Sequence, residues 1–122
     1  MATRAINITP LSNRWNEDCH TAQWTGLLNT DDGVPLEQPS SNDRSVQVTG
    51  TFGSGGTVVI EGSNDGTNYQ TLTDPQGNAL SVTAARLKQI SELTRFIRPR
   101  VTGGDGTTNL TVTMLIRRPY VR

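Results

Sequence analysis

The chain has 122 residues, a single cysteine, and 11 acidic against 11 basic side chains, so it fits one domain without an internal disulfide. It contains neither the ~7–15-residue apolar run of a signal peptide nor the ~18 apolar residues of a membrane helix. We therefore expect a soluble protein made in the cytoplasm, without a membrane partner. Only 33% of the residues are hydrophobic, so the core is thin and another subunit is expected to bury part of the apolar surface.

The charges are unevenly distributed along the chain. Residues 1–80 contain 3 basic and 9 acidic side chains, whereas residues 81–122 contain 8 basic and 2 acidic ones. Two interpretations are open. The two ends mix into an ordinary charged surface, or a basic face docks on an acidic neighbour.

Residues 1–18 are predicted to form an extended arm. The spacing of Ile6 and Ile8 is too irregular for one face of a helix. Trp15 follows Arg14 in polar surroundings, where it either packs on its own domain or anchors a partner, since buried Trp dominates interface energies. We expect Ile6, Ile8, Arg14 and Trp15 to contact a partner.

The next segments predict two strands separated by a long loop. Residues 19–28 and 46–52 alternate apolar and polar side chains, which is typical of strands with one buried face. Residues 29–45 are polar, contain two prolines and exceed the ~12–15 residues of an ordinary loop. We expect this loop to bind a partner, with Leu36 as a contact.

Residues 56–73 predict a hairpin. Two β-branched or aromatic runs flank residues 63–68, whose Asp-Gly dipeptide is a strong hairpin signal. Residues 79–83 predict a further short strand. Residues 84–93 are interpreted as a loop or an edge strand, because the segment is short for a helix and has no cap.

A second hairpin is expected near the C-terminus. Residues 94–102 are predicted to pair with residues 107–117 across the glycine-rich residues 103–106. Pro99 cannot donate to a ladder, so its strand is expected at a sheet edge, or Pro99 at a bulge.

Seven or eight short strands separated by turns predict an all-β protein. We expect residues 19–122 to form a single antiparallel β-sandwich, jelly-roll-like, with the arm in front of it. A parallel sheet is not expected, since strands do not alternate with helices.

The residues that carry catalysis are not assembled in any recognisable pattern. His20 is the only histidine, and it neighbours Cys19 in a predicted strand, so the two side chains point to opposite faces. Cys-x-x-Cys spacing is absent, and the Asp-rich turns lack the calcium-loop pattern. The sequence predicts no enzyme, no metal site and no cofactor.

Arg98 and Arg100 share one face of a predicted strand, in a basic C-terminal third. A nucleic-acid surface would interleave such a stripe with stacking aromatics, and only Phe96 and Tyr120 are near. A protein interface and a solvated face are both open. We expect Arg98 and Arg100 to contact a protein, and no nucleic acid.

Two segments resemble a known family. Residues 60–69 (IEGSNDGTNY) and 95–106 (RFIRPRVTGGDG) are similar to segments of tailed-bacteriophage capsid decoration, or cement, proteins of β-sandwich or jelly-roll type. The resemblance covers roughly residues 46–118. It implies a virion protein on the capsid exterior, commonly a homotrimer, that bridges and stabilises subunits of the major capsid protein.

The turn at residues 63–68 also resembles one in galactose-binding-like, or discoidin, jelly rolls. The alternative function is therefore a carbohydrate-binding module. In that case loop aromatics such as Trp24 or Tyr69 are expected to contact the sugar.

Overall fold

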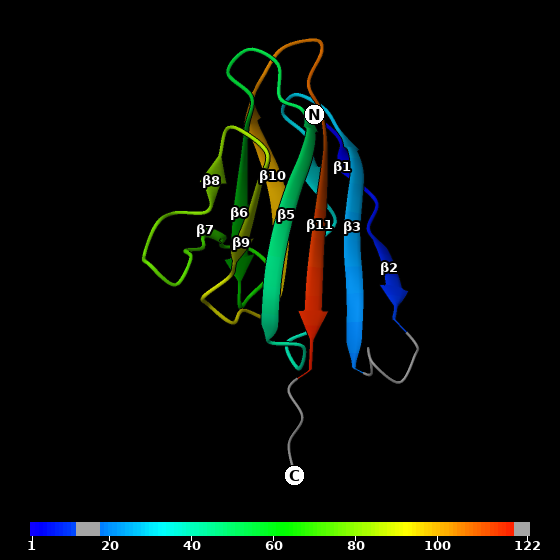
Figure 1. The fold of residues 1–122 in the computed structure, drawn as a ribbon, viewed down its shortest axis with the longest axis vertical. Coiled ribbons are helices and arrows are strands. Elements are labelled where there is room, and N and C mark those ends of the chain that lie inside the picture. The colour runs from blue at the N-terminus through cyan, green and yellow to red at the C-terminus, as the bar shows by residue number, and fades with distance from the viewer. Residues whose placement is uncertain (12–17, 119–122) are drawn as a thin grey trace.

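The computed structural model describes residues 1–11 and 18–118, and these residues form two β-sheets packed as a sandwich (Figure 1). The described residues contain no helix, so none of them forms a helix that could cross a membrane. The expected all-β sandwich is confirmed.

Each sheet combines strands from distant parts of the chain. Sheet A has the order β1–β4–β10–β6–β7, with β8 also beside β6, and sheet B has the order β2–β3–β11–β5–β9. The strands of sheet A are β1 Thr3–Arg4, β4 Asp32–Gly33, β6 Thr57–Ser63, β7 Gln70–Thr71, β8 Ser81–Val82 and β10 Phe96–Gly103. Those of sheet B are β2 Asn7–Pro10, β3 Cys19–Leu27, β5 Asp43–Thr51, β9 Arg86–Gln89 and β11 Asn109–Arg117. The pairs are antiparallel except β1 with β4, which are parallel.

The core lies between the sheets and follows the two-residue period of the strands. In β11 the inward side chains, from Leu110 to Ile116, are fully buried, while their neighbours face outward. Trp24 of β3 is also fully buried, and its indole nitrogen donates to the backbone oxygen of Val34 at 2.9 Å. That bond satisfies the one polar atom of the largest core side chain.

The hairpin predicted at residues 56–73 is confirmed, since β6 and β7 are antiparallel neighbours. Asp65 organises the turn by accepting hydrogen bonds from the backbone of Thr67 and Asn68, both at 2.8 Å. These bonds hold the pKa of Asp65 well below its usual range. Gly66 adopts a φ of 80° in the same turn, which glycine tolerates without steric cost.

The second predicted hairpin is wrong. β10 lies in sheet A and β11 in sheet B, so the glycine-rich loop between them crosses from one sheet to the other. Asp105 joins this loop to the one between β5 and β6 by accepting a hydrogen bond from the backbone of Ser54 at 2.8 Å, and the Thr108 hydroxyl donates to the Phe52 carbonyl at 2.8 Å. Alternating strands joined by a short loop look alike in sequence whether they pair or face each other across a core.

Pro99 lies neither at an edge nor at a bulge. Its strand, β10, lies between β4 and β6, and the irregular register of the pair with β6 lies between Val101 and Gly103. The amides of Ile97 and Val101 donate to carbonyls of residues 31–36 at 3.0 and 2.7 Å. The backbone nitrogen of Pro99 faces the same side of β10 as these two amides and lies midway between them. β4 spans only two residues, so the ladder between β4 and β10 is interrupted at this point.

The described part of the predicted arm belongs to the sandwich. β1 pairs with β4 in sheet A and β2 pairs with β3 in sheet B, so residues 1–11 join the edges of both sheets. Asp31 fixes the first residues, because its carboxylate accepts hydrogen bonds from Ala2 N at 2.9 Å and Arg4 Nε at 2.7 Å. The pairing uses backbone groups, which the irregular spacing of Ile6 and Ile8 does not reveal.

The loop predicted at residues 29–45 is likewise structured, in contrast to the sequence expectation. It contains β4 and a bridge between Leu36 and Ile97, and β5 begins at Asp43. Arg44 is 2% exposed and donates to the carbonyl oxygens of Ser41 and Gln38, at 2.7 and 2.6 Å. Burial lowers the pKa of the Arg44 guanidinium. The loop is thus wrapped around a buried side chain.

Candidate interaction surfaces

Arg98 and Arg100 lie on the outer face of β10, as their predicted alternation requires. Both guanidinium groups donate to the carboxylate of Glu61 in the neighbouring strand β6, at 2.8 and 3.1 Å. Glu61 is only 4% exposed, although it lies on the outer side of its sheet. The two arginines therefore cover a buried carboxylate.

Two further side chains complete this group. The centroid of the Tyr69 ring lies 3.9 Å from the guanidinium carbon of Arg98, in cation–π geometry. Asp32 Oδ2 is 3.7 Å from Arg98 Nη1. We name Asp32, Glu61, Tyr69, Arg98 and Arg100 the arginine–carboxylate cluster.

The arginine–carboxylate cluster has balanced charge and internal partners. Its two carboxylates match its two guanidinium groups, so the basic residues that share this face of β10 have counter-charges within the chain. Burial raises the pKa of Tyr69, and the neighbouring Arg98 opposes that rise. The Arg100 side chain remains 43% exposed, which leaves it the more accessible of the two arginines for an external acidic group.

The other predicted contact residues are scattered. Ile6 is half-buried against the core, and Ile8 is 39% exposed on the edge strand β2. Leu36 is 1% exposed and belongs to the core, so its predicted role as a surface contact is wrong. Arg14 and Trp15 lie outside the described residues.

The carbohydrate alternative loses one of its two aromatic residues. Trp24 is fully buried between the sheets, because the alternation of β3 directs it inward. Tyr69 is half-buried, with one ring face against Arg98. A sugar-stacking platform would need an open aromatic face, which Trp24 does not provide.

Cys19 and His20 point to opposite faces of β3, as predicted. Cys19 is paired with Arg117, whereas His20 is paired with the fully buried Ile116. Within residues 1–11 and 18–118, no three His, Cys, Asp or Glu side chains gather as a metal site would require.

Sheet B presents a surface that the sequence reasoning missed. Cross-strand partners share a face, so the pairing register identifies its outward side chains, which we name the sheet B face. Its members are Asn7 and Thr9 in β2; Cys19, Thr21, Gln23 and Thr25 in β3; Asn109, Thr111, Thr113, Leu115 and Arg117 in β11; Asp43, Ser45, Gln47, Thr49 and Thr51 in β5; and Leu87 and Gln89 in β9.

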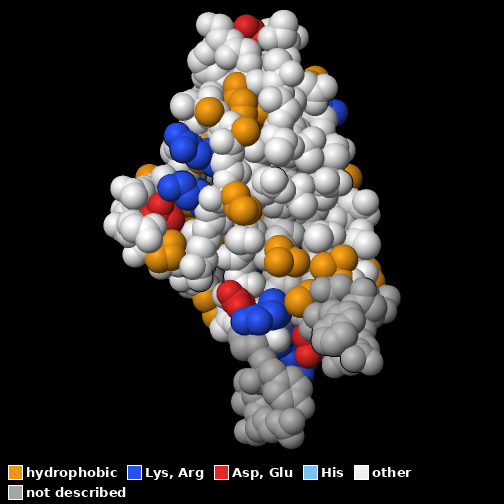
Figure 2. Space-filling model, in the orientation of Figure 1, with side chains coloured by type: hydrophobic (Ala, Val, Ile, Leu, Met, Phe, Trp, Pro, Cys, Tyr) orange, Lys and Arg blue, Asp and Glu red, His pale blue; other side chains and the backbone are white. Residues whose placement is uncertain are grey.

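The sheet B face carries almost no charge. Asp43 and Arg117 are its only ionisable members apart from Cys19, and they form an ion pair at one end. Figure 2 shows this face toward the viewer, with uncharged and hydrophobic atoms over its middle and charged side chains near its margins. The signal in the sequence was the run of Thr, Ser and Gln at alternate positions of three strands.

A hollow of about 480 Å³ lies at the charged end of this face. Its lining residues are Cys19, Asp43, Arg44, Ser45, Gln89, Leu115 and Arg117. Leu115 is 44% exposed there, and Leu87 on the edge strand β9 is 67% exposed. The face therefore combines neutral polar groups with two accessible leucines.

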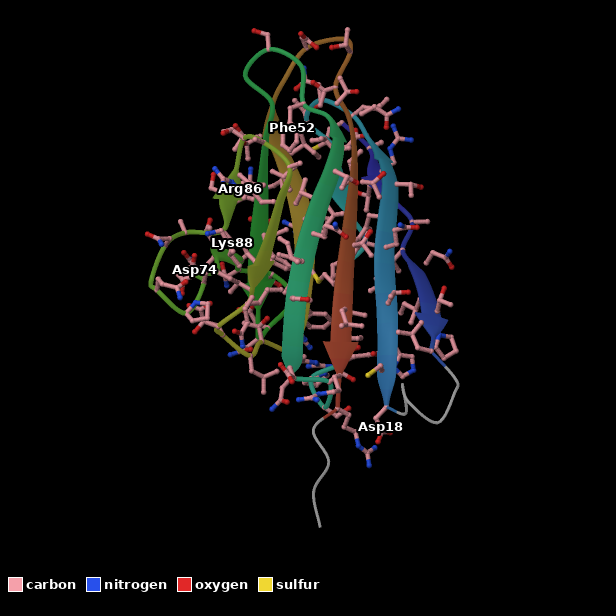
Figure 3. The ribbon with its side chains drawn as sticks, viewed as in Figure 1. Asp18, Phe52, Asp74, Arg86 and Lys88 are labelled. Atoms are coloured by element: carbon pink, nitrogen blue, oxygen red, sulfur yellow. The ribbon has the colours of Figure 1, made fainter. Side chains whose placement is uncertain are left out.

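The edge strand β9 directs its charges away from the sheet B face. Lys88 is paired with Val46 and Arg86 with Val48, both inward-facing positions. Lys88 Nζ reaches Asp74 Oδ2 at 3.4 Å, beyond the end of β7. Figure 3 shows Arg86, Lys88 and Asp74 together at the β9 edge of the molecule, on the left of the view. Inward-pointing charges on an edge strand also discourage pairing with a further strand.

No protein-family model matches this chain, and no curated protein matches it. Among solved structures, the SPBc2 prophage-derived protein YomS is similar, with a TM-score of 0.61 and 10% sequence identity. The match covers 80% of this chain and 93% of the YomS chain. The two proteins share a fold. YomS is prophage-derived, so this two-sheet architecture occurs in a phage-related protein.

Proposed function

We propose that the chain is a virion structural protein that binds the outside of a phage capsid and stabilises the shell by bridging major capsid subunits. The fold shared with the prophage-derived YomS is the observation that carries the proposal. The resemblance of residues 60–69 and 95–106 to capsid decoration proteins supports it independently. The proposal assigns the chain no reaction and no cofactor.

The packing of the segments supports a mechanical role. Residues 1–11 pair with both sheets, residues 31–36 are bonded to β10, and Asp105 ties the two loops at one end of the sandwich. A protein whose loops and N-terminal segment are held in place by hydrogen bonds loses little conformational entropy when it binds. More of its contact energy is then available to hold capsid subunits together. Many equivalent copies on one shell would add avidity.

We propose Arg100 and Ile8 as capsid contacts, since both are accessible: Arg100 on the outer face of sheet A and Ile8 on the edge strand β2 of sheet B. Arg100 offers a guanidinium group to an acidic neighbour, which suits carboxylate recognition. Ile8 offers an apolar side chain that is 39% exposed. Arg14 and Trp15 stay among the proposed contacts from the sequence.

The test is binding of the purified chain to expanded capsids of its phage, stripped of decoration protein. We expect the chain to co-sediment with the shells and to raise the temperature at which they disrupt. Arg100→Ala should weaken binding by roughly five- to tenfold, the loss of one charge-assisted contact. Arg86→Ala removes an exposed arginine on β9 and is the matched control. Absence of co-sedimentation by the unmodified chain would refute the proposal.

A further inference from the structure

The sheet B face differs from an ordinary solvated sheet surface. It spans three adjacent nine-residue strands, β3, β11 and β5, flanked by β2 and β9. Its charged residues, Asp43 and Arg117, lie side by side at one end and neutralise each other. Depletion of charged residues is the compositional mark of the centre of an interface.

Two accessible leucines strengthen this interpretation. Leu115 is opposite Ser45, and Leu87 is opposite Gln47 of the same strand. Both side chains therefore lie on this face, at 44% and 67% exposure. Covering them removes apolar surface from water, which favours association.

We propose that a second copy of this chain covers the sheet B face, so that two sandwiches pack sheet to sheet. Threonine hydroxyls and glutamine amides both donate and accept hydrogen bonds, so the polar side chains of two identical faces can form hydrogen bonds with each other. A two-fold contact uses the same patch on both copies and requires this self-complementarity. An acidic or basic partner would find no opposite charge over the middle of the face.

The size of the face suits a specific dimer. Strand spacings of ~4.8 Å and a rise of ~3.3 Å per residue give the five strands a projected area of roughly 550 Å². Two copies would bury about 1,100 Å² even without corrugation, which clears the ~1,000 Å² expected of a specific interface. Side chains standing out of the sheet increase that figure.

The symmetry of this contact has a consequence for the number of copies. A face that pairs with its own twin about a two-fold axis gives an even assembly. The trimer implied by the resemblance to decoration proteins requires a different, head-to-tail surface. Native mass therefore separates the two arrangements without any capsid present, and the outcome does not depend on the proposed function.

The experiment is sedimentation equilibrium of the purified chain between about 1 and 100 μM, concentrations at which a dimer of micromolar or tighter affinity is populated. We expect a mass of two chains at the upper concentrations. Gln47→Lys places a charge near the middle of the face, and we expect it to weaken dimerisation at least about tenfold, since the two lysines and buried polar groups would be desolvated. Thr102→Lys adds the same charge at an exposed position of β10 on sheet A and is the matched control.

Each result has a defined meaning. A monomer throughout the range, or a trimer, would overturn the inference. Dimerisation of Gln47→Lys as tight as that of the unmodified chain would also overturn it, by placing the interface elsewhere. Circular dichroism melting of both variants checks that they fold, and Leu115→Ala provides a second, uncharged variant that should also weaken the dimer.

Discussion

Gly33 lies so close to the indole of Trp24 that a Cβ atom at position 33 would come within 2.5 Å of Trp24 Cδ1. The Pro99 ring is also close, with its Cδ 2.9 Å from the same point. Trp24 is fully buried and tethered through its indole nitrogen to Val34. The close approach of β4 to the core thus depends on the missing side chain.

Gly33→Ala is therefore expected to destabilise the protein by about 1–3 kcal/mol, the usual cost of overpacking a filled core. Urea unfolding followed by circular dichroism measures the change. Gly106→Ala is the control, because nothing lies within 4 Å of a Cβ atom there. Equal stability of Gly33→Ala and the parent chain would show that β4 moves away from Trp24 freely.

Glu61→Gln is expected to destabilise the protein by about 1–3 kcal/mol, because it removes the charge that two arginines share. The cost lies below that of a fully buried pair, since the Arg98 and Arg100 side chains are 24% and 43% exposed and water can replace part of the interaction. Glu37→Gln removes one side of an exposed pair with Arg95. That control should change the free energy of unfolding by less than about 0.5 kcal/mol.

Leu36→Ala is expected to cost about 2–4 kcal/mol, the range for truncating a buried leucine. The matched control is Leu93→Ala, because Leu93 is 49% exposed and its truncation should have little effect. Urea unfolding of both variants distinguishes a core residue from a surface contact. A stable Leu36→Ala variant that fails only in capsid binding would restore the role expected from the sequence.

Acid should loosen the end of the sandwich where Asp105 joins two loops. Its hydrogen bonds, first from the Thr107 side chain and then from the Ser54 backbone, lower the pKa of Asp105 from 3.8 to about 2. A depressed folded-state pKa contributes stability above the unfolded value, and that contribution is lost as the pH falls from about 4 to 2. Asp105→Asn should be less stable than the parent at pH 7, with the difference shrinking toward pH 2. A constant difference across melting curves from pH 7 to 2 would contradict this assignment.

Alternation was sufficient for the longer strands, because it directly reports one buried side, whereas β1, β2 and β4 fall in segments that were expected to be an arm and a loop. Residues 46–52 and 107–117 each contain a strand with the expected inward positions. In residues 19–28 the alternation holds as far as Trp24, after which the register shifts, so that Leu27 is buried and Leu28 is 41% exposed. The assignment of strands to sheets was not accessible in the same way. It depends on contacts between distant residues, such as Thr113 with Gln23 and with Gln47, which no local pattern encodes.

At the candidate surfaces, too, a local pattern predicts some features, whereas others depend on residues distant in sequence. The common face of Arg98 and Arg100 was predictable from their spacing. Their partner Glu61 was not predictable, because it lies in another strand, 37 residues before Arg98 in the sequence. The polar composition of residues 29–45 suggested a free loop. Arg44 reverses that expectation, because its guanidinium donates hydrogen bonds to two backbone carbonyl oxygens of this segment.

Among the described residues, β11 is the last strand in sequence, and it lies between β3 and β5 in sheet B. During synthesis, β3 and β5 leave the ribosome before the strand that joins them exists. Both would then expose open backbone groups, which are sites for pairing with other chains. Sheet B therefore has to be completed after translation of β11, and nascent chains that stall earlier are expected to need chaperone protection.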